Sequence, residues 1–179
     1  MSDVPSSGGL QILLLQEYLR RSFRDFISLS WTPSLCEDEI NKYIQISPRT
    51  LGLNCVDFWT DVQDYISIRS GHFQFYRASH IYEKYIMHGA SHAIPIPTTV
   101  IDECTDIIST HSRKCDSTVF ASAEAEILDF LIAEVYPKFE REALQEAHRS
   151  NNDYSISYLA AGAKSIYRRR NSYFKSPDK

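Results

Sequence analysis

Apolar residues recur along this chain at intervals of three and four, the spacing that lines up side chains on one face of a helix. The clearest run extends from Leu10 to Trp31 and predicts one long helix that Pro33 ends, because proline lacks the backbone N–H that helix continuation needs. Residues 1–9 are rich in Ser and Gly and have no apolar face, so we expect a disordered lead. The stripe of the long helix comprises Ile12, Leu15, Leu19, Phe23, Phe26 and Ile27.

Further helices are expected in the middle of the chain, after a short helical pattern at residues 40–44. We interpret Ser47-Pro48 and Leu51-Gly52 as breakers, so the second long helix is predicted to begin near Asn54. The next helix spans about residues 78–87, and Gly89 is placed to end it. Residues 93–97 contain two prolines and are predicted to be extended. The inward positions of the two helices are Phe58, Val62, Tyr65, Ile66, Arg69, Ile81, Tyr82, Tyr85 and Ile86.

The last third of the chain repeats the helical pattern. Thr99, with Asp102 three residues later, resembles a capping box that opens a helix, and a polar loop follows at residues 111–118. The next strong helix is predicted to end or kink near Tyr136, because Pro137 cannot donate, before a further helical piece at residues 138–149. Strand-like alternation does not recur, so the sequence predicts an all-α fold of about eight helices. The apolar stripe before the proline comprises Phe120, Ala123, Ile127, Phe130 and Leu131, with Glu134 at its end.

Composition narrows the classes of protein to consider. The 179 residues suffice for one domain with an ordinary core, and 19 basic against 23 acidic residues give a net charge of −4. That balance argues against a nucleic-acid binder and favours a protein partner. The longest apolar run, residues 12–15, is far too short for a membrane span, and no signal-peptide pattern is seen. The four cysteines lack a C-x-x-C pair, so we expect free thiols and a cytoplasmic, soluble protein.

The sequence gives little support for an enzyme. His88 and His92 are four residues apart, but Gly89 lies between them and no H-E-x-x-H pattern is present, so we expect surface histidines rather than zinc ligands. The glycines form no phosphate-binding motif. Cys55 sits near a predicted helix N-terminus, which would lower its pKa, but a buried and inert thiol is the favoured interpretation. We therefore expect no catalytic residue, no metal and no cofactor.

Residues 150–179 form a basic C-terminal extension on an otherwise acidic chain. A solvated end is the simpler interpretation. The alternative is attraction to an anionic membrane surface, helped by the aromatic residues nearby. Within residues 164–179 the basic positions are Lys164, Arg168, Arg169, Arg170, Lys175 and Lys179, against the single acidic Asp178.

Several of these patterns, taken in order and spacing, resemble the RGS (regulator of G-protein signalling) domain. They are the run VDFW at residues 56–59 with Asp64-Tyr65, the pairs at 81–82 and 85–86, the Ile-Pro loop, Phe120 with Ala123, and Tyr136-Pro-x-Phe139. The resemblance covers about residues 10–146, and it implies a bundle of four central helices with a smaller subdomain built from the terminal helices. It divides the chain into a lead at 1–9, an RGS-like domain at 10–149 and the basic extension.

The resemblance also implies a function. Such domains bind a G-protein α subunit (Gα) and speed GTP hydrolysis by stabilising the transition-state geometry of its switch segments, without a catalytic site of their own. The docking face comes from three segments: the start of the VDFW helix, the Ile-Pro loop and the end of the helix before Pro137. The implied contact residues in this chain are Asn54, Cys55, Ile94, Pro95, Phe130, Glu134, Val135 and Lys138.

This chain departs from the family pattern on that face. Asn54 and Cys55 replace the usual Glu-Asn pair, and Pro95 replaces an asparagine that reaches the catalytic glutamine of the G protein. Val135 removes a hydroxyl, and Lys138 lacks the forked geometry of arginine. We therefore expect Gα binding with weak or absent GTPase activation. The alternative is a non-activating RGS-homology scaffold in a membrane-associated signalling or polarity complex.

Overall fold

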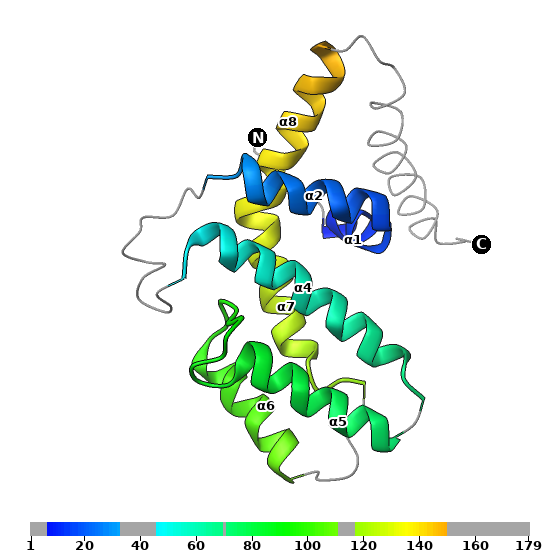
Figure 1. Cartoon of the computed structure of the whole chain (residues 1–179), viewed down its shortest axis with the longest axis vertical. Coiled ribbons are helices and arrows are strands. Elements are labelled where there is room, and N and C mark those ends of the chain that lie inside the picture. The colour runs from blue at the N-terminus through cyan, green and yellow to red at the C-terminus, as the bar shows by residue number, and fades with distance from the viewer. Residues whose placement is uncertain (1–6, 33–45, 70, 111–116, 150–179) are drawn as a thin grey trace, which may run out of the picture.

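The computed structural model describes residues 7–32, 46–69, 71–110 and 117–149, and within these ranges all regular secondary structure is helical, with no strand (Figure 1). This confirms the predicted all-α class. Two short π-helical turns, η1 and η2, interrupt the α-helices. The elements are α1 (Ser7–Leu15), α2 (Glu17–Leu29), α4 (Pro48–Ser67), α5 (Gly71–Ile81), η1 (Tyr82–Ile86), α6 (Thr98–Thr110), α7 (Ala121–Phe130), η2 (Leu131–Val135) and α8 (Tyr136–Arg149).

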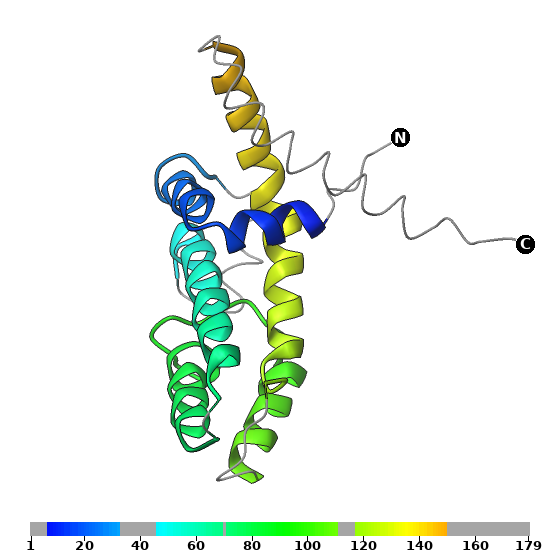
Figure 2. The same ribbon diagram turned by 90° about the vertical axis from the view of Figure 1, so that its right-hand side faces the viewer.

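The helices form a bundle with a second group of helices across one end. The bundle consists of α4, α5, α6 and α7. The second group, α1 and α2, lies across the end of the bundle from which α8 continues the column of α7 (Figure 2). One hydrophobic cluster runs through both groups. Its centre is aromatic, because the ring of Phe58 contacts Tyr85 at 5.4 Å and Phe120 at 6.0 Å between centroids.

The first predicted helix is divided in two. Gln16 is extended (φ −91°, ψ 113°), and α1 begins at Ser7, inside the stretch expected to be disordered. Because of the break, Leu14 and Phe23 both reach the core. Leu15, which was predicted to lie on the buried face, is instead 66% exposed. The guanidinium of Arg20 donates to the carbonyl of Leu14 at 2.8 Å and so caps the end of α1.

The presumed breakers before Asn54 are part of α4. Ser47 is the N-cap, where its hydroxyl accepts from the amide of Thr50 at 3.2 Å, and Pro48 occupies the first turn, where a missing N–H costs nothing. Gly52 lies inside the helix and faces α2, since an added Cβ would meet Ile27 Cγ2 at 3.1 Å. The glycine therefore serves close helix packing rather than helix termination. Ile66, near the end of α4, and Arg69, beyond it, are exposed instead of facing the core.

Two other helix boundaries differ from the prediction. Helix α5 begins at Gly71, about two turns before the predicted residue 78. The π-helical turn η1 follows it without a gap. Helix α6 begins at Thr98, so Thr99 lies inside the helix and is not its N-cap. Gly89 does adopt the left-handed conformation that favours glycine, with φ of +79°, in the turn after η1.

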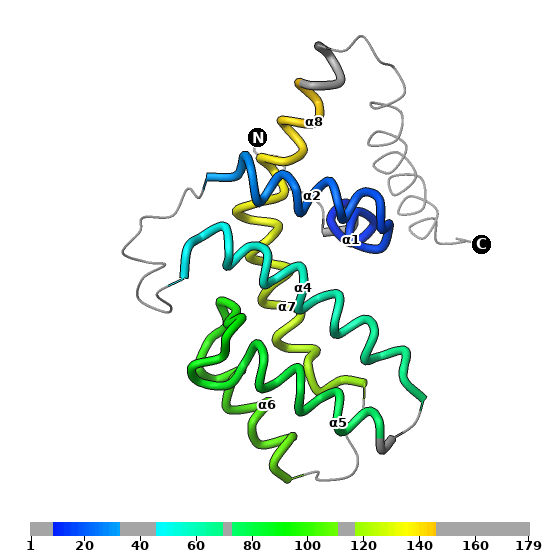
Figure 3. Tube along the Cα trace, viewed as in Figure 1, coloured from blue at the N-terminus to red at the C-terminus, as the bar shows by residue number. Residues whose placement is uncertain are grey.

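Pro137 does not end its helix. Helices α7 and α8 continue through η2, where the amide of Tyr136 donates to the carbonyl of Leu131, five residues earlier. A π-helical turn changes the hydrogen-bond register within a continuing helix, which places Pro137 in the first turn of α8. The tube drawing traces this column without a gap (Figure 3).

Some predictions fall outside the described residues. They include residues 1–6, the pattern at 40–44, most of the loop at 111–118 and the whole basic extension. Within the described part, no helix is long and apolar enough to cross a membrane. The division into lead, domain and extension stays a prediction.

Candidate partner-binding surface

The structure joins the first two predicted segments directly. The side-chain amide of Asn54 donates to the carbonyl of Ala93 at 3.1 Å, although these residues are 39 positions apart. Asn54 is 3% exposed, and this bond accounts for a polar side chain buried next to an apolar core. The residue therefore holds the Ile-Pro loop against α4.

The loop itself is positioned by η1. The amide of His92 donates to the carbonyl of Lys84 at 3.0 Å, and that of Ile94 donates to the carbonyl of Tyr85 at 3.3 Å. Both acceptors lie near the C-terminal end of η1, where the carbonyl groups have no partner within the helix and are available to a neighbouring chain segment. Ile94 and Ile96 point into the core, while Pro95 between them is partly exposed.

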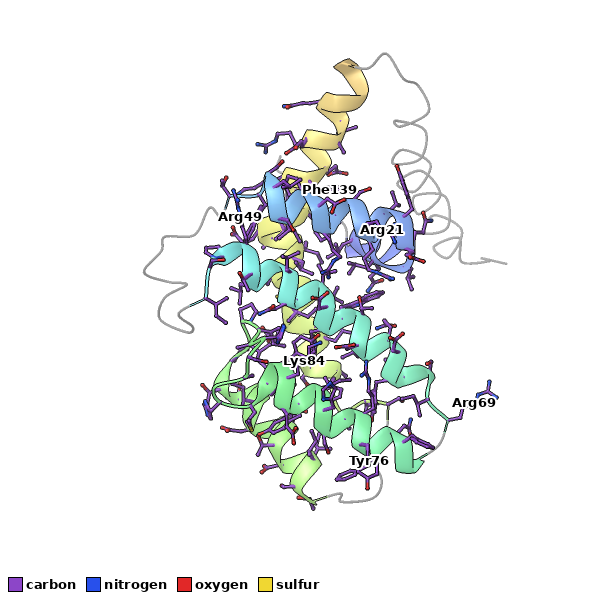
Figure 4. The ribbon with its side chains drawn as sticks, in the orientation of Figure 1. Arg21, Arg49, Arg69, Tyr76, Lys84 and Phe139 are labelled. Carbon is purple, nitrogen blue, oxygen red and sulfur yellow. The ribbon has the colours of Figure 1, made fainter. Side chains whose placement is uncertain are left out.

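Asp61, on α4, connects this helix to η1 through its carboxylate. Its carboxylate accepts from Arg77 at 2.6 Å, from Lys84 at 3.0 Å and from the hydroxyl of Tyr85 at 2.7 Å. Burial works against the ionised carboxylate, but the hydrogen bonds from Tyr85 and Lys84 and the two nearby cations outweigh it, so the pKa of Asp61 lies below its ordinary value. Figure 4 labels Lys84 close to α4. The middle segment is thus fixed to the bundle by a charged cluster.

The third segment is tied to the end of α2. The indole N–H of Trp31 donates to the carbonyl of Glu134 at 3.1 Å, and the ammonium group of Lys138 donates to the carbonyl of Thr32. On its other side, the end of α2 is tied to α4, because Arg49 Nε donates to the carbonyl of Trp31 at 3.2 Å. Figure 4 shows Arg49 beside the end of α2. Residues 31 and 32 thus bridge the start of α4 and η2.

These bridging residues were missed by sequence reasoning. Trp31 ends the stripe of α2 and gives no sign of a polar contact 103 residues away, and Arg49 follows a proline that we interpreted as a breaker. Only recognition of Ser47-Pro48 as a helix start would have placed Arg49 in the first turn of α4.

The eight predicted contact residues separate into two groups by burial. Pro95, Phe130, Glu134 and Lys138 are partly exposed, so their side chains are accessible to a partner. The other four are buried, so their side chains are not accessible to a partner. They contribute to the surface by positioning the nearby backbone. The buried residues are Asn54 (3% exposed), Cys55 (0%), Ile94 (4%) and Val135 (0%).

Cys55 lies in the third turn of α4, away from the helix N-terminus that would activate it. Complete burial raises the pKa of its thiol far above the usual range, so the thiolate that oxidation and metal binding require is suppressed. The inert interpretation is the one that the structure supports. Among the described residues, no three His, Cys, Asp or Glu side chains gather closely enough to hold a metal ion.

The start of α4, the Ile-Pro loop and η2, which lie far apart in the sequence, are thus linked through Asn54 and Trp31 in a helical bundle. The model of the family described as "Regulator of G protein signaling domain" matches residues 42–146. The chain therefore belongs to the RGS family, whose members regulate G-protein signalling, typically bind Gα subunits and have no catalytic site of their own. A comparison with curated proteins found no match. Helix α2 precedes the matched residues but packs on α4, and α1 packs on α2.

Proposed function

We propose that this chain binds a Gα subunit through the rim formed by the start of α4, the Ile-Pro loop and η2, and that it accelerates GTP hydrolysis weakly or not at all. Family membership supports binding. The bonds from Asn54 to Ala93 and from Trp31 to Glu134 support a rim whose segments are held in fixed relation before a partner arrives. A preorganised surface of this kind loses little entropy on binding.

The observation that carries weak activation is the scarcity of polar side chains on the rim. Pro95 has no side-chain donor or acceptor, Cys55 and Val135 are buried, and the amide of Asn54 is engaged with Ala93. RGS-type activation depends on holding the switch segments in the transition-state geometry. Each missing hydrogen bond removes about 0.5–1.5 kcal/mol of that stabilisation.

Binding is tested with purified Gα loaded with GDP and aluminium fluoride, which mimics the transition state. Glu134→Lys reverses a charge on the rim, and we expect it to weaken binding about tenfold, which corresponds to about 1.4 kcal/mol. Glu126→Lys makes the same change at an exposed position of α7 outside the rim and should leave binding unchanged. Equal affinities for the two variants would contradict this docking face.

Activation is tested by single-turnover GTP hydrolysis. The unmodified chain should change the rate little, and Pro95→Asn should increase it by about tenfold by restoring a side-chain donor and acceptor. Pro97→Asn, two residues along the same loop and also exposed, is the matched control. The buried Cys55 is left in place, because an amide there would lie inside the core. A strong rate increase by the unmodified chain would refute weak activation.

The second candidate is a non-activating scaffold in a membrane-associated signalling or polarity complex. The same scarcity of polar rim groups favours it. Failure to bind Gα in both the GDP and the aluminium fluoride states, across several Gα classes, would select the scaffold over the first proposal.

The localisation proposal is a cytoplasmic protein with contact to membrane surfaces. The basic extension, with Arg168, Arg169 and Arg170, lies outside the described residues, and its excess positive charge supports attraction to anionic lipid. Sedimentation with anionic vesicles, but not with neutral ones, is the expected result. Equal sedimentation with both would contradict an electrostatic contact.

A further inference from the structure

An open pocket of about 270 Å³ lies where α2 crosses α8, and residues of these two helices and the C-cap of α2 line it. Its floor is apolar, because the rings of Phe26 and Phe139 meet edge to face there with centroids 5.5 Å apart. Figure 4 labels Phe139 at this crossing. Leu29 stands at the edge of the pocket with 76% of its surface exposed, and Ala143 adds to the apolar wall. The pocket thus offers apolar surface to an occupant.

The edge of the pocket is acidic. Asp25 on α2 and Glu142 on α8 line it, and none of its eight lining residues is basic. Two cations close in sequence to the lining residues are engaged elsewhere: Arg21 pairs with Glu17 at 3.4 Å, and Lys138 donates to the carbonyl of Thr32. An occupant that carries positive charge beside apolar or aromatic groups would match both the floor and the edge.

The chain itself contains such a segment, which lies on the C-terminal side of α8. Residues 164–175 begin fifteen positions after Arg149, the end of α8, and an extended stretch of that length spans up to about 50 Å. Glu142 lies only about 10 Å back along the helix at 1.5 Å per residue. The segment can therefore return to the pocket. It combines Lys164, Arg168, Arg169, Arg170 and Lys175 with Ile166, Tyr167, Tyr173 and Phe174.

We propose that the segment 164–175 docks into the α2–α8 pocket of the same chain, with an aromatic side chain over Phe26 and Phe139 and basic side chains at Asp25 and Glu142. This inference concerns a surface other than the rim and does not rest on Gα binding. The same cations cannot contact the pocket and an anionic membrane at once, so docking competes with membrane contact.

The first test compares amide spectra of the ¹⁵N-labelled full chain with and without Arg168→Gln, Arg169→Gln and Arg170→Gln, in the absence of lipid. We expect shifts at residues 22–30 and 139–143, and none in α5 or α6. High salt should reproduce these shifts, because it screens the same charges. Unchanged signals at the pocket on neutralising the segment would overturn the proposal, and so would shifts confined to residues outside α2 and α8.

The second test is a charge exchange in the full chain. Glu142→Lys should expose the segment and speed tryptic cleavage at Arg168–Arg170 about threefold, the scale expected of exposed ion pairs. Adding Arg169→Glu should restore pocket signals that Glu142→Lys alone changes. Glu126→Lys, exposed on α7, is the control and should leave cleavage at this site unchanged. Equal rates of cleavage in Glu142→Lys and Glu126→Lys would overturn the proposal. A rate in Glu142→Lys that equals that of the unmodified chain would also overturn it.

Discussion

Replacing Trp31 with phenylalanine tests whether the end of α2 holds the rim together. The substitution removes the indole N–H that donates to the carbonyl of Glu134 at 3.1 Å but leaves an aromatic ring in the core. It also removes the ring atoms that lie nearest to Gly52, since Trp31 Cζ3 is 3.5 Å from the position of an added Cβ there. The backbone carbonyl of Trp31, which accepts from Arg49, is unaffected.

The expected loss of stability has two parts. A hydrogen bond of this kind contributes about 0.5–1.5 kcal/mol net. Trp31 is 1% exposed, so the shorter side chain also leaves a void, which costs roughly 1–2 kcal/mol because the surroundings collapse only in part. Together they predict that Trp31→Phe lowers the free energy of unfolding by about 2–3 kcal/mol.

Urea denaturation measures this loss directly, and we expect the midpoint to fall by about 1 M. Trp59→Phe is the matched control, because Trp59 is also buried and its indole is hydrogen-bonded to the side chain of Glu124, inside the bundle. Both variants should lose similar stability. Only Trp31→Phe should also weaken binding to Gα loaded with GDP and aluminium fluoride, since only Trp31 contacts a rim segment.

Two results would refute the reasoning at different points. An unchanged urea midpoint for Trp31→Phe would show that the contact with Glu134 does not stabilise the fold. A lowered midpoint with unchanged Gα binding would leave the contact as a purely structural one and separate it from the rim.

Three further substitutions test the electrostatics and the backbone. Asp61→Asn should lower the free energy of unfolding by about 2 kcal/mol at pH 7. Because the pKa of Asp61 in the folded chain lies below 3.8, its stabilising contribution is present above that pH and is lost as the pH falls through the folded pKa. Urea denaturation at pH 7 and at low pH measures the difference. Burial raises the pKa of Glu124 above 4.5, although the hydrogen bonds from Gln63 and Trp59 act in the opposite direction. The stabilising contribution of the protonated Glu124 is therefore present below pH 4.5 and is lost as the pH rises through the folded pKa. Glu124→Gln should therefore be more stable to urea than the unmodified chain at pH 7 and equally stable in acid, because the amide does not ionise. Gly89→Ala should cost about 1 kcal/mol in thermal unfolding, because the backbone at φ +79° disfavours a side chain even though space is open. A stability difference between the unmodified chain and Asp61→Asn or Glu124→Gln that does not change with pH would contradict these assignments, and so would an unchanged melting temperature for Gly89→Ala.

The wrong boundaries share one cause. Periodicity and breaker residues describe what a segment can do alone, and Ser47-Pro48 and Gly52 are breakers in isolation. In the fold, the first pair starts α4 and the glycine allows α2 to approach it, because Ile27 Cγ2 would lie 3.1 Å from a Cβ. Likewise, the stripe from Leu10 to Trp31 fits one helix, but packing of both halves against the core favours a break at Gln16.

The amino-acid sequence by itself determined the all-α class, the family and the approximate place of the rim segments, because these depend on periodicity and on motif residues close together in the chain. Only the tertiary structure decided which rim side chains are accessible. Burial of Cys55 and Val135, and the bonds from Trp31 to Glu134 and from Asn54 to Ala93, join residues far apart in the chain. Such contacts arise only when the helices pack, so no local pattern encodes them.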